Sequence, residues 1–241
     1  MPRKRLILHI GTHKTGTSSF QRSLNRNREA LIKQGLLPVS EIKIRRGEET
    51  DKKRANATGI AHLFIRPELL TGVRIGKAAP ELTEDQCKTR RARLAERLRD
   101  LPDQTVLLSA EAFSFLRTPD EQQAMRDFLT ETERDVLTIA VFREETAWRE
   151  SWENQLKFSP NTYQAVMRQP DEQRINADWF YDTSAIRAFW APFNLTELSY
   201  EAHDNIVDTL YKTMGLSTAD LKTDLRANTR KTGTLHDQIQ T

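Results

Sequence analysis

The chain has 241 residues, 37% of them hydrophobic and 29% charged, with a net charge of +3 and a single cysteine, Cys87. This length suits one sizeable domain rather than two, and the lone cysteine excludes an intramolecular disulfide and a cysteine zinc cluster. No apolar run approaches the roughly 20 residues that span a bilayer, so we expect a cytoplasmic protein with no transmembrane segment.

The first predicted element is a short buried strand over residues 6–10, which follows a basic start. Because this apolar run is short and enters a polar loop, we interpret it as a strand and not as a secretory signal. A helix is predicted over residues 17–34, with Gly35 as its C-terminal stop. Residues 41–57 are charged and carry almost no large apolar side chains, which predicts a solvated, mobile loop. A short helix is predicted over residues 58–65.

The rest of the chain alternates between helices and strands. Compact apolar runs at residues 105–109 and 136–142 predict buried parallel strands. Further helices are predicted over 84–101, 144–157, 163–168, 184–190 and 204–214, and another begins near Pro119. A strand is predicted over 195–200, and a polar C-terminal tail over 222–241. The sequence therefore predicts an α/β fold with a P-loop-like parallel β-sheet flanked by helices on both faces, as a single domain over residues 1–241.

A loop rich in glycine and hydroxyl residues joins the first strand to the first helix. Such strand-loop-helix units direct backbone N–H groups and a helix N-terminus at an anion. The version in nucleotide triphosphatases, G-x-x-x-x-G-K-[ST], carries its lysine directly after the second glycine. Here Gly11 and Gly16 keep that spacing, but Thr17 stands in the lysine position and Lys14 lies inside the loop. The candidate anion-binding residues are Gly11, Thr12, His13, Lys14, Thr15, Gly16, Thr17 and Ser18.

This loop resembles the 5′-phosphosulfate loop of sulfotransferases that use 3′-phosphoadenylyl sulfate (PAPS), in particular a bacterial branch with the segment G-T-x-K-T-G-T-[ST]. Sulfotransferases share a second signature, in which an arginine ending a core strand and a serine about two helical turns later bind the 3′-phosphate of PAPS. Arg143 and Ser151 match this signature, and Trp148 and Gln155 flank the serine as in that branch. The resemblance covers most of the chain. It implies a PAPS-dependent sulfotransferase that releases adenosine 3′,5′-bisphosphate and needs no metal.

The resemblance also implies roles for the candidate catalytic residues. Lys14 would neutralise the negative charge that builds on the bridging oxygen as the phosphate leaves. Glu111 is the first candidate for the base that accepts the acceptor's proton, because it follows the strand after which cytosolic sulfotransferases carry their catalytic histidine. A role of Glu111 as a cap of the following turn stays open, and His62 is the second candidate base. His13 is expected to shape the loop or to touch the sulfate.

The predicted partners are a nucleotide donor and, from the resemblance to bacterial enzymes, a glycan or glycolipid acceptor. The first half of the chain suits a polyanionic ligand, since residues 1–101 hold 23 Lys and Arg against 11 Asp and Glu. The sequence has no basic stripe interleaved with aromatic residues, which is the pattern that would predict a nucleic-acid partner. Five aromatic residues could stack on a sugar, although their spacing is more typical of a core: Trp148, Trp152, Trp179, Phe180 and Tyr181.

Two other functions stay open. A P-loop kinase or NTPase would need a lysine after Gly16 and an aspartate at the end of a core strand, whereas the strands here end in Ser109 and Arg143. A noncatalytic protein that binds nucleotides or sulfated glycans would bind PAPS without consuming it. The basic segment 226–233 could cover the 3′-phosphate or form an ordinary solvated tail, and the oligomeric state is open.

Overall fold

The computed structural model describes residues 4–39, 55–77, 81–101 and 104–224, and in these ranges five strands form one sheet. The strands are β1 (Arg5–His9), β2 (Leu36–Pro38), β3 (Thr105–Ser109), β4 (Asp135–Phe142) and β5 (Leu195–Ser199). Their order across the sheet is β2-β3-β1-β4-β5, and every neighbouring pair runs parallel. The prediction of an α/β fold built on one parallel sheet is confirmed.

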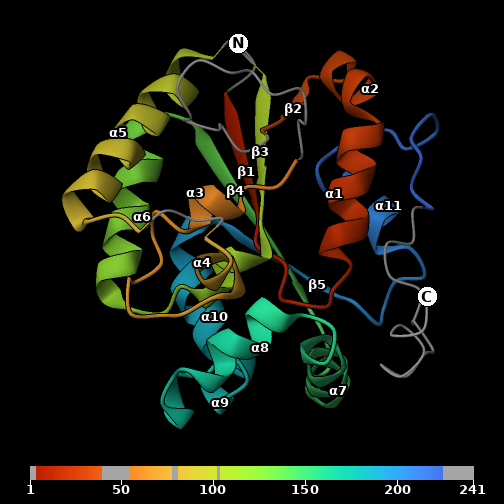
Figure 1. Cartoon of the computed structure of the whole chain (residues 1–241). Helices are drawn as coiled ribbons and strands as arrows, with labels where there is room; N and C mark the ends of the chain where they lie inside the picture. Colours follow the sequence, from red (N-terminus) through yellow and green to blue (C-terminus); the bar gives the residue numbers. More distant parts are fainter. Residues whose placement is uncertain (1–3, 40–54, 78–80, 102–103, 225–241) are drawn as a thin grey trace, which may run out of the picture.

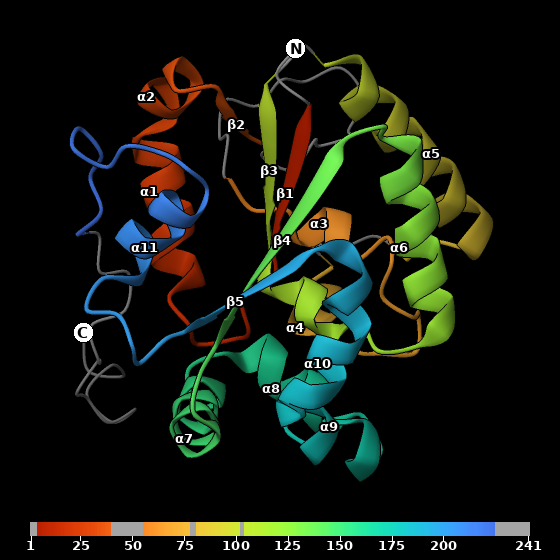
Figure 2. The same ribbon diagram turned by 180° about the vertical axis from the view of Figure 1, so that it is seen from behind.

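Helices cover both faces of this sheet, as predicted (Figure 1 and Figure 2). The helices on one face are α1 (Thr17–Arg26), α2 (Arg28–Lys33) and α11 (Ile206–Thr213), and those on the other are α5 (Glu84–Asp100), α6 (Pro119–Glu131) and α10 (Thr183–Trp190). Successive side chains of a strand point to opposite faces. Ile7 of β1 therefore packs with α1, whereas Leu6 and Leu8 pack in the core on the opposite face. Burial on both faces explains why β1, β3 and β4 appear in the sequence as continuous apolar runs, whereas β5 is partly exposed.

Other elements lie around the carboxyl ends of the strands. Figure 2 shows α7 (Glu145–Leu156), α8 (Pro160–Met167) and α9 (Asp178–Tyr181) beyond the end at which β1 and β4 finish. The short elements are α3 (Thr58–Ala61), α4 (Gly72–Ile75), η1 (Glu111–Phe115), η2 (Asp171–Gln173) and η3 (Ala191–Phe193). Helix α4 packs against α8, and α3 packs against η1. These contacts build a wall beside the carboxyl edge of the sheet.

The first helical region differs from its prediction. The helix expected over residues 17–34 is broken at Asn27, whose side-chain amide bonds the main chain of Lys222 twice. Asn27 Nδ2 donates to the Lys222 carbonyl, and Asn27 Oδ1 accepts from the Lys222 N–H, both at 3.0 Å. The helix expected over 58–65 ends at Ala61, and strand β2 was not predicted at all.

Parts of two predictions lie outside the described residues. Residues 41–54 of the expected mobile loop over residues 41–57 lie outside the described residues, while Ala55 and Ala57 are buried. The N–H of Ala57 donates to the carbonyl of Ser109 at 2.9 Å, so this end of the loop is packed against β3. Residues 225–241 of the expected tail also lie outside. Among the helices that the structure describes, none has the length and apolar character needed to cross a membrane.

Candidate functional site

Three segments meet at the carboxyl edge of the sheet. Residues 11–16 follow β1, Glu111 opens η1 after β3, and Arg143 follows β4. Because β1 lies between β3 and β4 in the sheet, the loop after β1 is the neighbour of both other segments. Ligands of open parallel sheets bind at this edge. The structure thus brings together three segments that are far apart in the sequence.

The loop after β1 is anchored to β4 and turns sharply before α1. Thr12 donates from its N–H and from its Oγ1 to the carbonyl of Val141, each at 3.1 Å, and Thr15 Oγ1 donates to the Thr12 carbonyl at 2.5 Å. Lys14 and Gly16 have positive φ values of 70° and 83°. Helix α1 begins directly afterwards, so the N–H groups of its first turn are available to an anion held by the loop.

Gly16 is a position in this loop where a side chain would meet both backbone strain and crowding. A Cβ there would lie 2.9 Å from Cγ2 of Ile206 on α11, whereas Gly35 has the same φ of 83° with open space around it. We expect Gly35→Ala to lower the free energy of unfolding by about 1–2 kcal/mol through strain alone. Gly16→Ala should cost about 1–3 kcal/mol more through overpacking. Urea denaturation of both variants measures the difference, and equal losses would contradict the crowding at Gly16.

Lys14 and Glu111 form an electrostatically coupled pair at this edge, and both side chains are half-buried. Burial lowers the pKa of the Lys14 ammonium, the Glu111 carboxylate opposes that change, and Arg143 adds to it. Burial also raises the pKa of the Glu111 carboxyl group, which Lys14 in turn holds down. Perturbed groups that act on each other in this way are typical of sites where a proton is exchanged.

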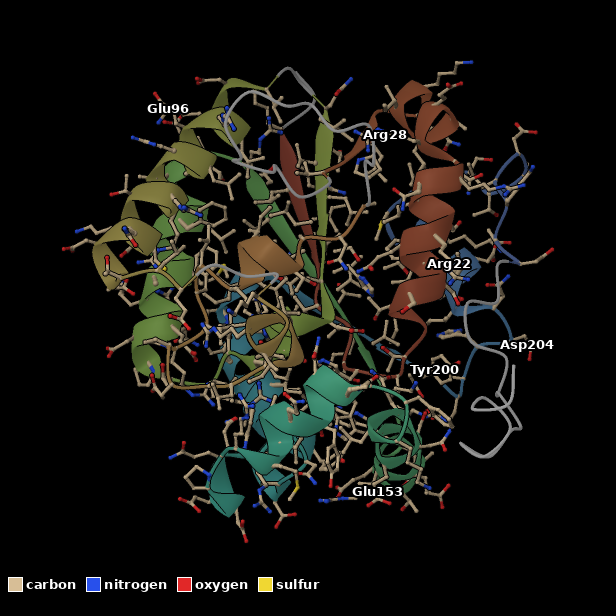
Figure 3. The ribbon with its side chains drawn as sticks, in the orientation of Figure 1. Arg22, Arg28, Glu96, Glu153, Tyr200 and Asp204 are labelled. Atoms are coloured by element: carbon tan, nitrogen blue, oxygen red, sulfur yellow. The ribbon has the colours of Figure 1, made fainter. Side chains whose placement is uncertain are left out.

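Arg143 links the loop to the ends of β4 and β5. Its Nη1 donates to the main-chain carbonyl of Lys14 at 3.0 Å, and its Nε lies 3.6 Å from Oε1 of Glu201. Its guanidinium stacks over the ring of Tyr200, 5.2 Å from the ring centroid, and Figure 3 shows Tyr200 near the start of α1. The guanidinium is thus held in place, and its further N–H donors can still bind an anion.

Ser151 lies on α7, half-buried, and within the described residues its hydroxyl has no hydrogen-bond partner. The next residue, Trp152, packs edge-on against the ring of His13, with 4.9 Å between the ring centroids. This contact holds α7 against the loop after β1. The helix that carries Ser151 therefore lies beside the loop that carries Lys14.

Two polar atoms of the loop are buried without a partner in the part of the chain that the structure describes. They are Oγ1 of Thr17 and Nδ1 of His13. Buried polar atoms are nearly always hydrogen-bonded, so an unpartnered hydroxyl at the start of a helix is available to a ligand. The Thr17 hydroxyl lies on the first residue of α1 and can donate to an anion there. This observation fits a phosphate group bound by the loop.

The two histidines near the site are held neutral by burial. Burial lowers the pKa of His62 to about 4, and that of His13 to about 3 with a further contribution from Lys14. Nδ1 of His62 lies 2.8 Å from the Thr58 carbonyl, and its Nε2 lies 2.8 Å from Oγ1 of Thr71. Both ring nitrogens of His62 are thus committed to the protein, so Glu111 is the better placed of the two candidate bases.

Most of the aromatic residues considered as sugar platforms are part of the core. Trp148, Trp152, Phe180 and Tyr181 are all buried, which agrees with the structural interpretation of their spacing. Trp179 is half-buried, with the guanidinium of Arg66 5.2 Å from its ring centroid.

A cavity of about 450 Å³ opens beside Glu111, His13 and His62. A second wall comes from Thr71, Gly72, Val73 and Gly76, around α4, and from residues 159–162, at the start of α8. Sequence reasoning missed this wall, because its residues come from two short segments without a motif or a periodic pattern. We name this space the acceptor cavity.

Comparison with known proteins assigns no family or function to the chain. No family model matches the chain, and a search of curated proteins finds no match. Within the described ranges, no group of three or more His, Cys, Asp or Glu side chains could hold a metal ion. The function is therefore inferred from the residues of this chain.

Proposed function

We propose that this protein is a PAPS-dependent sulfotransferase that transfers the sulfuryl group to a hydroxyl of a carbohydrate acceptor. The observation that carries the proposal is the contact between its two signature segments. Arg143 donates a hydrogen bond to the carbonyl of Lys14, the loop residue that is coupled to Glu111. A loop lysine, a second cationic anchor and a carboxylate are thus gathered at one edge of the sheet.

The residues of this edge suit the two phosphate groups of PAPS. The N–H groups at the start of α1 and the unpartnered hydroxyl of Thr17 are suited to the 5′-phosphate. Arg143 offers a planar set of donors for the 3′-phosphate, and Ser151 offers a hydroxyl from α7. Both groups would be bound by neighbouring segments, as an extended nucleotide requires.

The proposed reaction is an in-line displacement at sulfur. The acceptor oxygen forms a bond to sulfur while the bond from sulfur to the bridging oxygen breaks, and the electron pair of that bond stays on the 5′-phosphate. The proton of the acceptor hydroxyl passes to the carboxylate of Glu111. The Lys14 ammonium neutralises the charge on the departing oxygen, which stabilises the transition state. The products are the sulfated acceptor and adenosine 3′,5′-bisphosphate.

A P-loop kinase fits these residues less well. Thr17 occupies the position of the kinase lysine, and the position after β4 carries Arg143 where an acidic residue would organise Mg²⁺. A noncatalytic binding protein needs no base, whereas here a loop lysine and a carboxylate act on each other at the carboxyl edge of the sheet. The free, buried Cys87 is in keeping with a cytoplasmic enzyme.

Replacing Arg143 tests the nucleotide site. We expect Arg143→Ala to weaken binding of adenosine 3′,5′-bisphosphate by about 10–100-fold, because charge-assisted hydrogen bonds to the 3′-phosphate are lost. Calorimetric titration measures this change. Arg149→Ala is the matched control, since Arg149 lies on α7 in surface ion pairs with Glu145 and Asp178. Wild-type affinity in Arg143→Ala would contradict the assignment of this arginine.

A further inference from the structure

The acceptor cavity has the size of a small-molecule site and lies next to the candidate base. Its volume of about 450 Å³ falls within the usual range for ligand pockets of about 300–1,000 Å³. Glu111 and His13 lie on the side of the cavity that adjoins the loop after β1, so a ligand here would reach the reacting groups.

The second wall of the cavity depends on close contact between α4 and α8. A Cβ at Gly72 would lie 2.5 Å from Oγ1 of Thr162, and a Cβ at Gly76 would lie 2.7 Å from Nδ2 of Asn161. Two glycines on α4 and its C-terminal end therefore allow the two segments to approach each other. This approach fixes Asn161 and Thr162 in the wall of the cavity.

The charge of the lining limits the kind of ligand that fits. Among the described residues that line the cavity there is no lysine or arginine, and Glu111 is the one carboxylate. His13 and His62 are neutral there, because burial lowers the pKa of both rings well below 6.5. An anionic ligand would lie against the Glu111 carboxylate, whereas the cations that act on the lining groups, Lys14, Arg74 and Arg117, stand outside the lining, so contact with the carboxylate costs electrostatic free energy. A neutral ligand avoids that cost.

The lining also offers hydrogen-bonding groups that the protein itself does not use. The side chains of Gln155, Asn161 and Thr162 line the cavity and, across the ranges that the structure describes, bond no other residue. Amides and hydroxyls of this kind can both donate and accept. A ligand with several hydroxyl groups presents the same two capacities and matches such a wall.

We propose that the acceptor cavity binds a neutral, polyhydroxylated acceptor of the size of a mono- or disaccharide and presents one of its hydroxyls to Glu111. The proposal rests on the sulfotransferase function proposed above, whose acceptor it narrows. It assigns Gln155 on α7 and Asn161 on α8 as residues that determine acceptor specificity. Neither side chain touches the loop's anion-binding atoms in this scheme, so both act on the acceptor alone.

The test measures sulfate transfer from PAPS to a panel of saccharides by the full chain. The panel pairs glucose and galactose with their uronic acids, and adds maltose and lactose. We expect transfer to a neutral sugar to exceed transfer to its uronic acid at least about tenfold. Equal or greater transfer to the uronic acids, or no transfer to any neutral sugar, would overturn the inference.

Variants of Gln155 separate the inference from the function on which it rests. Gln155→Ala should raise the KM for the neutral sugar about 5–10-fold, the effect of one lost hydrogen bond, and leave binding of adenosine 3′,5′-bisphosphate unchanged. Gln155→Lys should shift the preference toward the uronic acids. The matched control is Gln164→Ala, an exposed glutamine of α8 outside the cavity. An unchanged KM and preference in both Gln155 variants would overturn the inference, whereas a wild-type chain that does not bind the bisphosphate would overturn the sulfotransferase function as well.

Discussion

Lys14→Met is expected to reduce turnover of PAPS by about 10²–10³-fold, the usual effect of removing one preorganised group that stabilises developing charge. Methionine keeps an unbranched side chain of similar length and removes the ammonium group, with its positive charge and its N–H donors. The loop should keep its conformation, because the carbonyl of residue 14, and not its side chain, accepts the hydrogen bond from Arg143. Binding of adenosine 3′,5′-bisphosphate should also weaken, because the departing oxygen that Lys14 neutralises belongs to the 5′-phosphate of this product. Single-turnover kinetics together with calorimetry measure the two effects.

The controls for Lys14 separate charge from general surface effects. Lys157→Met removes an exposed lysine at the end of α7 and should leave turnover unchanged. Lys14→Arg keeps the charge and should retain more activity than Lys14→Met, because part of the electrostatic stabilisation remains. If Lys14→Met turned over PAPS at the wild-type rate, Lys14 would have no part in the chemistry, and the proposed role of the loop lysine would be wrong.

Glu111→Gln is expected to lower kcat by about 10²–10⁴-fold, the range that a general base contributes. Glutamine preserves the shape of the side chain but cannot accept the proton. Glu153, labelled on α7 in Figure 3, is exposed, and Glu153→Gln is the matched control that should retain full activity. Full turnover by Glu111→Gln would show that Glu111 is not the base; a cap of η1 is not its role either, since the structure shows no side-chain cap there.

The pH dependence of kcat follows from the electrostatic coupling between Lys14 and Glu111. A general base works as the carboxylate, so turnover should fall as the pH drops through the pKa of Glu111, which burial raises above its ordinary value. Lys14 opposes this rise, so Lys14→Met should move the acid limb of the profile to higher pH. An acid limb at the same pH in wild type and Lys14→Met would show that the group which titrates is not coupled to Lys14.

Four of the five described strands could be located from the sequence, three of them because they are buried apolar runs. The apolar runs at 105–109 and 136–142 coincide with β3 and β4 to within one residue, and residues 6–10 lie one residue beyond β1. The partly exposed strand β5, at the edge of the sheet, matches the prediction over 195–200 to within one residue. Strand β2 could not be located, since a three-residue segment that ends in Pro38 carries no period. It forms a strand only because it pairs with β3.

The break between α1 and α2 shows how a distant contact can override a local pattern. The sequence over residues 17–34 contains no proline and no internal glycine, so nothing local predicts an interruption. Asn27 lies at the break and binds the main chain of Lys222, which is 195 residues away. No pattern within a single helix can reveal such a partner.

The candidate site was predictable only where it is contiguous. The loop of residues 11–18 has its own spacing, and Arg143 follows an apolar run, so both could be named from the sequence. The partners of His62 could not, because Thr71 comes from another segment and commits a ring nitrogen that a base would need. The wall formed by α4 and α8 could not be predicted from the sequence for the same reason. Its residues meet only in the folded chain.

The most direct test of the central claim is calorimetric titration of the wild-type chain with adenosine 3′,5′-bisphosphate in the presence of EDTA, beside a titration with ATP and Mg²⁺. The sulfotransferase account predicts binding of the bisphosphate without metal, with a Kd in the micromolar range. Metal-dependent binding of ATP together with no binding of the bisphosphate would contradict the account. The P-loop kinase would then be the better interpretation of the loop around Lys14.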